Sequence, residues 1–332
     1  MTAPAQTPPA GSLAVDVNGL VHRYGSRTAL NGLNFTVQRG EIFGLLGPNG
    51  GGKTTTFRIL STLIPPQQGA VRILGFDLAT QAQEIRRRIG VVFQSPSLDK
   101  KLTAYENLMH QGHLYGMRGT ALDARIKLLL ERVKLSDRSN EYVETFSGGM
   151  RRRVELAKGL IHGPQLLLLD EPSTGLDPGA RRDLWQYLEQ LSRDEGVTSL
   201  LTTHYMEEAA HCHRLGIINK GELVALDTPA RLRETIGGDV ITIQAKDPEA
   251  VRTEIKEKLK LDATLVDGSL RIERENGPEL IGALGQALPG RIEAMTISKP
   301  TLEDVFIRRT GHKFWVEAVE EDTPKGKKKA KH

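Results

Sequence analysis

A glycine-rich stretch carries the clearest chemical signal in this sequence. The residues Gly47-Pro48-Asn49-Gly50-Gly51-Gly52-Lys53-Thr54 meet the spacing Gly-x-x-x-x-Gly-Lys-Thr, which is typical of loops that hold nucleoside triphosphates. A triphosphate needs several inward-pointing backbone N–H groups, and a glycine-rich turn can supply them. Lys53 can reach the β and γ phosphates, and Thr54 can place its hydroxyl on Mg²⁺. The stretch predicts triphosphate binding, although it selects neither the base nor the task.

Two carboxylates form the second candidate group. The apolar segment 166–169 ends in Asp170 and Glu171. In α/β sheets, ligands bind outside the carboxyl ends of the strands, so both side chains should lie beside the glycine-rich loop. We expect Asp170 to hold Mg²⁺, directly or through water, and Glu171 to polarise an attacking water. Together with the loop, this pair predicts hydrolysis of the bound triphosphate.

Strands and helices alternate around these residues. Alternating or continuous apolar segments predict strands at 13–17, 33–37, 41–46, 71–74, 89–93, 166–169 and 198–202. Helical spacing is expected at 54–63 and from 103 to about 135. This order predicts a largely parallel sheet that is covered on both faces.

The pattern changes after residues 227–229. Strands are expected at 240–245, 263–266, 270–274 and 291–298, with helices at 248–260 and 278–288. The order β-α-β-β-α-β suggests a small ferredoxin-like unit. Thr301 then has the properties of a cap for a short final helix.

Composition limits the function classes. The chain has 332 residues, enough for two domains, and its 39% of apolar residues can form a sizeable core. Aromatic residues are only 5%, which weakens the case for a surface that stacks on nucleic acid. The single cysteine, Cys212, excludes an intrachain disulfide. Its neighbours His211 and His213 make a metal site conceivable, but we interpret all three as ordinary helix surface or core.

The sequence predicts no membrane span. Residues 1–11 lack the positive charge and apolar run of a signal peptide, and no apolar stretch approaches the roughly 20 residues that cross a bilayer. We expect the chain to be soluble, with another subunit supplying any spans. The net charge is +4, and part of it lies in the lysines of residues 317–332. We interpret this segment as a solvated tail in preference to a lipid or nucleic-acid contact.

The segment Phe146-Ser147-Gly148-Gly149-Met150-Arg151 resembles the signature of ATP-binding cassette (ABC) ATPases. Physically, Ser147 and the amides of the two glycines can form a second phosphate cradle at a helix start. Other family elements follow in the expected order. Gly51 and Phe146 depart from the alanine and leucine that the family most often carries, and neither change removes a phosphate contact.

The resemblance assigns roles to further residues. Tyr24 resembles the aromatic residue that stacks on adenine, and Gln94 the glutamine that contacts Mg²⁺ and water. Asp177 ends the segment 173–177, which resembles the loop that crosses the dimer interface, and His204 resembles the histidine that contacts the γ phosphate. The residues implied to bind ATP are Tyr24, Gly47, Pro48, Asn49, Gly50, Gly51, Gly52, Lys53, Thr54 and Thr55. Those implied in catalysis are Glu171, His204 and Gln94, and those implied to hold Mg²⁺ are Thr54, Gln94 and Asp170.

The resemblance covers roughly residues 13–226 and implies an α/β P-loop NTPase fold of the ABC type, with a mixed sheet core and a helical subdomain. It also implies a head-to-tail dimer, in which Ser147, Gly148, Gly149 and Met150 of one copy contact the ATP held by the other. The expected domains are a disordered N-terminus at 1–11, the cassette at 12–228 with its helical subdomain at about 100–160, a small C-terminal α+β domain at 238–310, and a charged, disordered tail at 317–332.

The segments 300–306 and 310–311 are similar to the C-terminal part of cassettes from daunorubicin-type drug exporters, and the strand-turn-strand pattern at 216–224 also fits. The implied task is to power export of a drug, lipid or glycan through a separate polytopic permease, from the cytoplasmic face of the membrane. A non-transport ABC ATPase acting on the ribosome or on nucleic acid is the alternative. A purely regulatory nucleotide-binding module would be expected to lack Glu171 or His204, and no nucleic-acid partner is expected.

Overall fold

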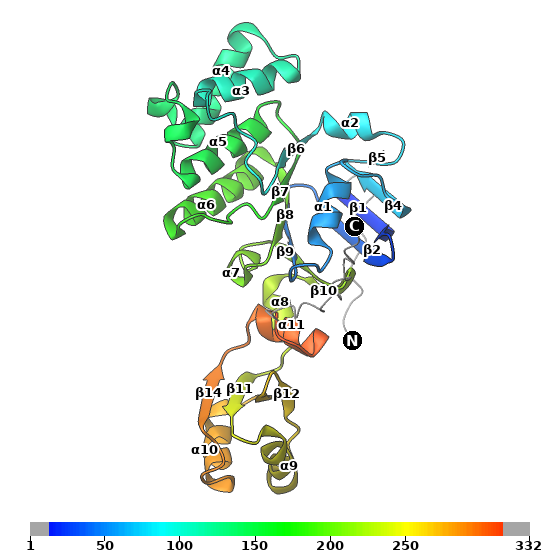
Figure 1. Ribbon diagram of the computed structural model, residues 1–332, viewed down its shortest axis with the longest axis vertical. Helices are drawn as coiled ribbons and strands as arrows, with labels where there is room; N and C mark the ends of the chain where they lie inside the picture. The colour runs from blue at the N-terminus through cyan, green and yellow to red at the C-terminus, as the bar shows by residue number, and fades with distance from the viewer. Residues whose placement is uncertain (1–12, 315–332) are drawn as a thin grey trace, which may run out of the picture.

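A six-stranded sheet forms the centre of the larger part of the molecule (Figure 1). The computed structural model describes residues 13–314, so the expectations for 1–11 and 317–332 lie outside the described residues. The strand order is β10-β9-β3-β8-β7-β6, and all neighbours are parallel except β10 and β9. The strands are β3 (Ile42–Leu46), β6 (Ile89–Val92), β7 (Leu166–Asp170), β8 (Thr198–Thr203), β9 (Arg214–Asn219) and β10 (Glu222–Asp227).

Burial on both faces explains the apolar strands of this sheet. Every residue of β3, β7 and β8 is buried, which is the usual environment of a parallel strand between two layers. One layer contains α1 (Lys53–Leu60), whose Phe57 is buried in the same core as Phe43 of β3. On the other side lie α5 (Gly148–Leu160) and α6 (Pro178–Glu195).

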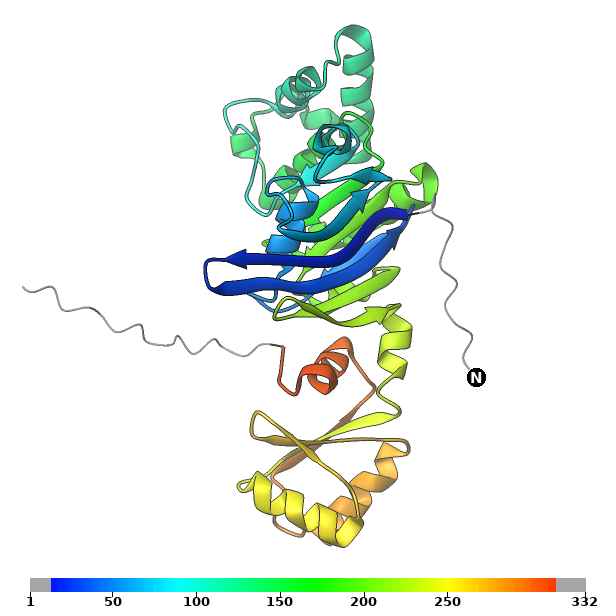
Figure 2. The same cartoon turned by 90° about the vertical axis from the view of Figure 1, so that its right-hand side faces the viewer.

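The first two strands belong to a separate antiparallel sheet, with the order β2-β1-β4-β5. Its strands are β1 (Leu13–Tyr24), β2 (Arg27–Gln38), β4 (Gln68–Ile73) and β5 (Phe76–Asp77). The long β1–β2 hairpin crosses the molecule in Figure 2. Both strands continue well beyond the expected ranges 13–17 and 33–37, because register shifts such as that between Val17 and Leu20 interrupt the simple alternation.

A helical part projects from the central sheet. It contains α3 (Ala104–Leu114), α4 (Gly119–Arg132), the short 3₁₀ turns η1 (Ser136–Arg138) and η2 (Val143–Thr145), and α5. Thr103 and Glu106 form a capping box at the start of α3. The helical pattern expected over 103–135 is divided in two, because Gly116 turns the chain with a φ of 77°. Two short helices, α2 (Ala82–Arg86) and α7 (Met206–Ala209), complete the larger part of the molecule before residue 227.

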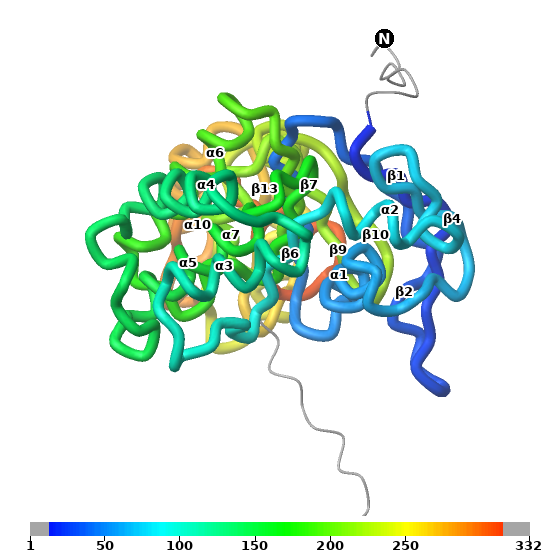
Figure 3. The backbone as a smooth tube through the Cα atoms, turned by 90° about the horizontal axis from the view of Figure 1, so that it is seen from above, coloured from blue at the N-terminus to red at the C-terminus, as the bar shows by residue number. Residues whose placement is uncertain are grey.

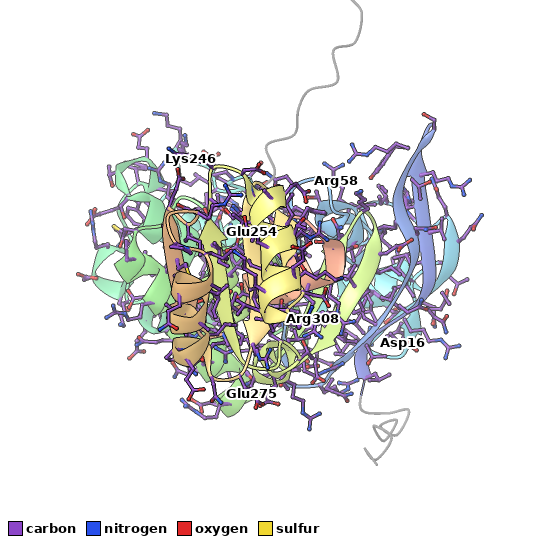
Figure 4. The ribbon with its side chains drawn as sticks, turned by 90° about the horizontal axis from the view of Figure 1, so that it is seen from below. Asp16, Arg58, Lys246, Glu254, Glu275 and Arg308 are labelled. Carbon is purple, nitrogen blue, oxygen red and sulfur yellow. The ribbon has the colours of Figure 1, made fainter. Side chains whose placement is uncertain are left out.

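The chain then passes through α8 (Pro229–Glu234) into a third sheet, with the order β12-β13-β11-β14. Its elements are β11 (Asp239–Gln244), α9 (Pro248–Leu259), β12 (Thr264–Val266), β13 (Ser269–Arg274), α10 (Gly277–Ala287) and β14 (Ala294–Ser298). All three pairings are antiparallel. Figure 4 shows α9 and α10 side by side across the sheet, with Glu254 labelled on α9. The element order is the one expected for a ferredoxin-like unit.

A final helix, α11 (Leu302–Thr310), packs beside α8 between this unit and the larger part (Figures 1 and 2). Thr301 caps it in a box with Asp304. Phe306 is fully buried in a cluster that also includes Leu46 and Ile217 of the central sheet. Asp304 also lies 2.5 Å from the buried Arg271 of β13, so one helix contacts both sheets. Among residues 13–314, none of the helices has the length and apolar character to cross a bilayer.

Candidate functional site

The glycine-rich loop joins β3 to α1, and its backbone requires glycine at defined positions. Gly50 and Gly52 have φ values of 76° and 112°, which other residues rarely adopt. A Cβ atom on Gly47 would lie 2.4 Å from the carbonyl oxygen of Ile218. Lys53 is buried and donates from Nζ to the carbonyl oxygens of Gly47, at 2.8 Å, and Pro48, at 3.2 Å. The loop therefore closes around its own lysine.

A hollow of about 150 Å³ opens beside this loop. It is lined by the following expected ATP-contact residues: Tyr24, Pro48, Asn49, Gly50, Gly52, Lys53, Thr54 and Thr55. Gly47 and Gly51 are buried behind it. The lining also includes Arg27, whose Nη2 donates to Gly50 O at 3.4 Å, and Glu171. Sequence reasoning missed Arg27, because a single arginine in a strand turn carries no motif.

The three expected catalytic side chains meet at the carboxyl ends of β6, β7 and β8. Glu171 Oε1 lies 3.0 Å from His204 Nδ1 and 3.7 Å from Lys53 Nζ. Gln94 Nε2 donates to the other carboxylate oxygen of Glu171 at 2.9 Å. The fold thus brings together Gln94 and His204, which are more than one hundred positions apart in the chain.

Glu171 also has an unusual backbone. Its φ is 44°, in the left-handed region that disfavours a non-glycine residue by about 1–3 kcal/mol. The backbone N–H donates to both the carbonyl and the hydroxyl oxygen of Thr202 on β8, each at 3.1 Å. The neighbouring strand therefore holds the carboxylate in a fixed direction at the strand end.

Asp170 is buried beside Glu171 and accepts a hydrogen bond from the Thr202 hydroxyl at 2.5 Å. Burial raises the pKa of Asp170, although the Thr202 bond and the Lys53 charge act in the opposite direction. Burial also lowers the pKa of Lys53, while Glu171 and Asp170 oppose this effect. A buried lysine between two carboxylates is an environment in which added negative and positive charges, such as phosphate and a cation, can be balanced.

Arg152, which sequence reasoning missed, connects the helical part to this strand end. Its guanidinium is buried and donates to the carbonyl oxygens of Pro172 at 2.7 Å, Phe93 at 2.7 Å and Asp170 at 3.3 Å. It also pairs with Glu155 at 2.8 Å. One side chain of α5 thus fixes the segments that carry Gln94 and Glu171.

Arg152→Met is expected to lower the free energy of unfolding by about 3–5 kcal/mol, because it leaves Glu155 as an unpaired buried charge. Urea titration followed by circular dichroism would measure the loss. Arg87→Met is the matched control, since Arg87 is exposed and its pair with Glu84 should contribute less than about 1 kcal/mol. Equal stability of the two variants would contradict the connecting role of Arg152.

The expected signature lies on a different part of the molecule. Ser147 caps α5, and its Oγ accepts from Met150 N at 3.2 Å. Asp177 caps α6 through Ala180 N at 3.0 Å. A Cβ atom on Gly149 would lie 2.9 Å from that of Ala180, so the two helix starts are adjacent. Figures 1 and 3 both place α5, which Ser147 caps, apart from α1, which begins at Lys53, and the nucleotide hollow has no residue of α5 in its lining.

Glu208 is a further buried carboxylate that sequence reasoning did not identify. Thr203 donates to its Oε2 at 2.7 Å, and Ser173 contacts its Oε1. Burial raises the pKa of Glu208. It ties the segment after Glu171 to the one that carries His204, but no motif marks it.

The His-Cys-His segment has a structural role. His213 Nδ1 accepts from Ile42 N at 2.9 Å, and Cys212 is buried beneath Gly44, where a Cβ atom would lie 2.6 Å from its sulfur. Within residues 13–314, no group of three or more His, Cys, Asp or Glu side chains could hold a metal ion.

Comparison with known proteins agrees with this geometry. Residues 30–174 match the family described as ABC transporter, and residues 228–310 match the C-terminal domain of DrrA1-3-like ATP-binding proteins. The chain is 42% identical over 303 residues to the Nod factor export ATP-binding protein I of Burkholderia lata, covering 90% of this chain and 98% of that protein. It is 39% identical over 313 residues to the daunorubicin resistance ATP-binding protein DrrA2 of Streptomyces coeruleorubidus, covering 90% and 96%.

Solved structures show the same relationship. An ATP-binding subunit of an ABC transporter aligns with a TM-score of 0.60 and 30% identity, over 67% of this chain and 92% of that one. The dimeric cassette MJ0796 bound to ADP and Pi aligns with a TM-score of 0.58 and 27% identity, over 64% and 98%.

Fold and site together define a P-loop ATPase of the ATP-binding cassette class. The chain belongs to the ATP-binding subunits of ABC transporters, in the group that carries a DrrA-like C-terminal domain. Its activity is ATP hydrolysis coupled to transport. The expected fold class and the expected family are confirmed.

Proposed function

We propose that this chain powers export of a hydrophobic drug, lipid or glycan through a separate polytopic membrane subunit. The observation that carries the proposal is the Glu171 carboxylate, which Gln94, His204 and Lys53 hold at the edge of the nucleotide hollow. The names of the relatives, which refer to export of Nod factor and to daunorubicin resistance, support export as the direction. The subunit would act on the cytoplasmic face of the membrane, bound to its permease.

The proposed catalytic roles follow from the polar contacts of the site. Glu171 polarises the attacking water, and His204 orients it toward the γ phosphate. Gln94 links the carboxylate to the loop after β6. Lys53 Nζ now donates to carbonyl oxygens of the loop, and the phosphate oxygens of ATP would take their place as acceptors.

The residues present fit Mg²⁺. Asp170 is a buried carboxylate with a raised pKa, and a cation beside it would favour its charged form. Thr54 at the start of α1 and Gln94 would supply the other oxygens. When bound, the ion neutralises charge on the phosphates.

We further propose that two copies of the chain form the working unit, head to tail. Ser147 and Lys53 lie on separate parts of one chain, while each is built as half of a phosphate site. The start of α5 would present the backbone N–H groups of Gly148 and Gly149 and a positive dipole end to the partner's ATP. The loop that ends at Asp177 would lie at the same interface.

Affinity purification of the full chain from solubilised membranes tests this proposal. A polytopic membrane protein is expected in stoichiometric amount, and the complex in lipid vesicles should hydrolyse ATP and move a hydrophobic fluorescent substrate. Recovery with ribosomes, lost as salt is raised, would instead support the non-transport alternative.

A further inference from the structure

A pocket of about 360 Å³ lies at the end of the central sheet opposite to the nucleotide hollow. It opens where β7 and β8 begin, next to Gln165 and Thr198, whereas the nucleotide site lies at the carboxyl ends of these strands. We call it the arginine pocket, because its charged lining residues are Arg39, Arg125, Arg132 and Glu195. Its volume is in the range of small-molecule sites.

The arginine pocket has an excess of positive charge. Three guanidinium groups face one carboxylate, and Arg132 Nη1 pairs with that carboxylate, Glu195. Arg125 donates to the carbonyl oxygens of Leu160 at 2.8 Å and Ile161 at 3.3 Å. Burial, followed by the neighbouring Arg132 charge, lowers the pKa of Arg125. The cluster therefore lacks a second anion.

Each guanidinium carries five N–H donors, and the contacts of the three lining arginines with described residues use one or two of them each. Tyr187 on α6 is buried and lines a neighbouring hollow that shares Arg132 with the arginine pocket, and among the described residues its hydroxyl has no hydrogen-bond partner. Burial raises the pKa of Tyr187 to about 12, and Arg132, Glu195 and Arg125 are the charged groups that act on it. Arg39 Nη1 donates to Gln165 Oε1 at 3.0 Å. A ligand that pairs with the remaining guanidinium donors must supply acceptor oxygens.

The rest of the lining combines an apolar wall with a few polar groups. The apolar wall is formed by Leu129, Leu160, Pro164, Leu191 and Val197, and Gly163, Gln165, Gly196 and Thr198 complete the lining. A simple inorganic ion would leave this surface in contact with water, whereas an anionic group on an apolar body would cover it. The apolar wall comes from α4 and the end of α5 in the helical part, and from α6 and the segments before β7 and β8 in the core, so an occupant would contact both.

We propose that the arginine pocket binds an organic anion, whose phosphate or carboxylate group pairs with the arginines and whose apolar body lies on the leucine-rich wall. This site is separate from the ATP site and from the mechanism proposed above. Because both parts of the cassette contribute to it, the bound anion would hold α4 against the strand starts.

Titration calorimetry with phenyl phosphate tests the proposal, using the full chain with its nucleotide site filled by ADP and Mg²⁺. One saturable site per chain is expected. Benzyl alcohol, which keeps the ring but lacks the charge, should show none. Saturable binding of both compounds with equal affinity would overturn the assignment, as would the absence of phenyl phosphate binding.

Three variants locate the site. Arg39→Gln and Arg132→Gln should each weaken phenyl phosphate binding about tenfold or more, because each removes a charge-assisted contact. Glu195→Gln should tighten it several-fold, since it removes the only competing carboxylate of the lining. Arg87→Gln, an exposed arginine elsewhere, should have no effect. Unchanged binding in both pocket arginine variants, or weaker binding in Glu195→Gln, would contradict the proposal.

Discussion

Glu171→Gln is expected to slow ATP turnover by at least ~100-fold, the typical contribution of a general base. Glutamine keeps the size of the side chain and its contacts with Gln94 and His204, but it cannot accept a proton from water. ATP affinity should remain close to that of the parent chain, because Lys53 and the glycine-rich loop are unchanged. ATP without hydrolysis should therefore hold two copies together.

Phosphate release and size-exclusion chromatography with ATP and Mg²⁺ would measure both effects. Glu189→Gln is the matched control, since Glu189 is exposed and lies away from the nucleotide hollow. The control should turn ATP over at the parental rate and should not accumulate as a dimer. Normal ATP turnover by the Glu171→Gln chain, purified alone or with its membrane partner, would contradict the general-base role of this carboxylate.

Some residues of the candidate site can be predicted from local sequence pattern, and others cannot. Lys53 and Thr54 follow a local spacing rule, and Asp170 follows a buried strand, so local pattern is sufficient to propose them. No local sequence pattern identifies Arg152. Its contacts with Pro172 and Phe93 arise only when α5 packs against two strand ends, and the linear order of residues does not contain that geometry.

The fold, too, has elements that local pattern predicts and elements that depend on contacts distant in the chain. β7, which is buried on both faces, is a continuous apolar run up to Asp170 and was predicted within one residue. The two strands β1 and β2, which pair as a hairpin, were each predicted too short, because glycines and register shifts break their alternation while backbone pairing continues. Its place in a second sheet was also beyond prediction, since pairing with β4 depends on contacts far along the chain.

The arginine pocket illustrates the limit most clearly. Arg39 precedes β3, Arg132 ends α4, and Glu195 ends α6, so the group spans more than one hundred and fifty positions. Nothing in the spacing of these residues marks a site. Only the packing of the helical part against the strand starts brings them around one cavity.

Mixing two inactive variants is expected to restore ATP turnover if each site is shared between copies. Lys53→Met removes the phosphate-binding ammonium, and Ser147→Arg blocks the signature with a bulky cation; each chain alone should be inactive. A dimer that contains one of each has one intact site, built from the Lys53 of one chain and the Ser147 of the other. Random association should then restore about a quarter of the parental sites.

The controls separate this effect from damage to the fold. Ser147 is exposed and caps α5, so its replacement should cost about 1 kcal/mol of stability. Asp247→Ala removes the equivalent cap of α9, far from the nucleotide, and should keep full turnover. Phosphate release should appear in the mixture and in neither variant alone. If the mixture stays as inactive as the two separate variants, Ser147 of one chain does not complete the ATP site of the other, and the head-to-tail arrangement is wrong.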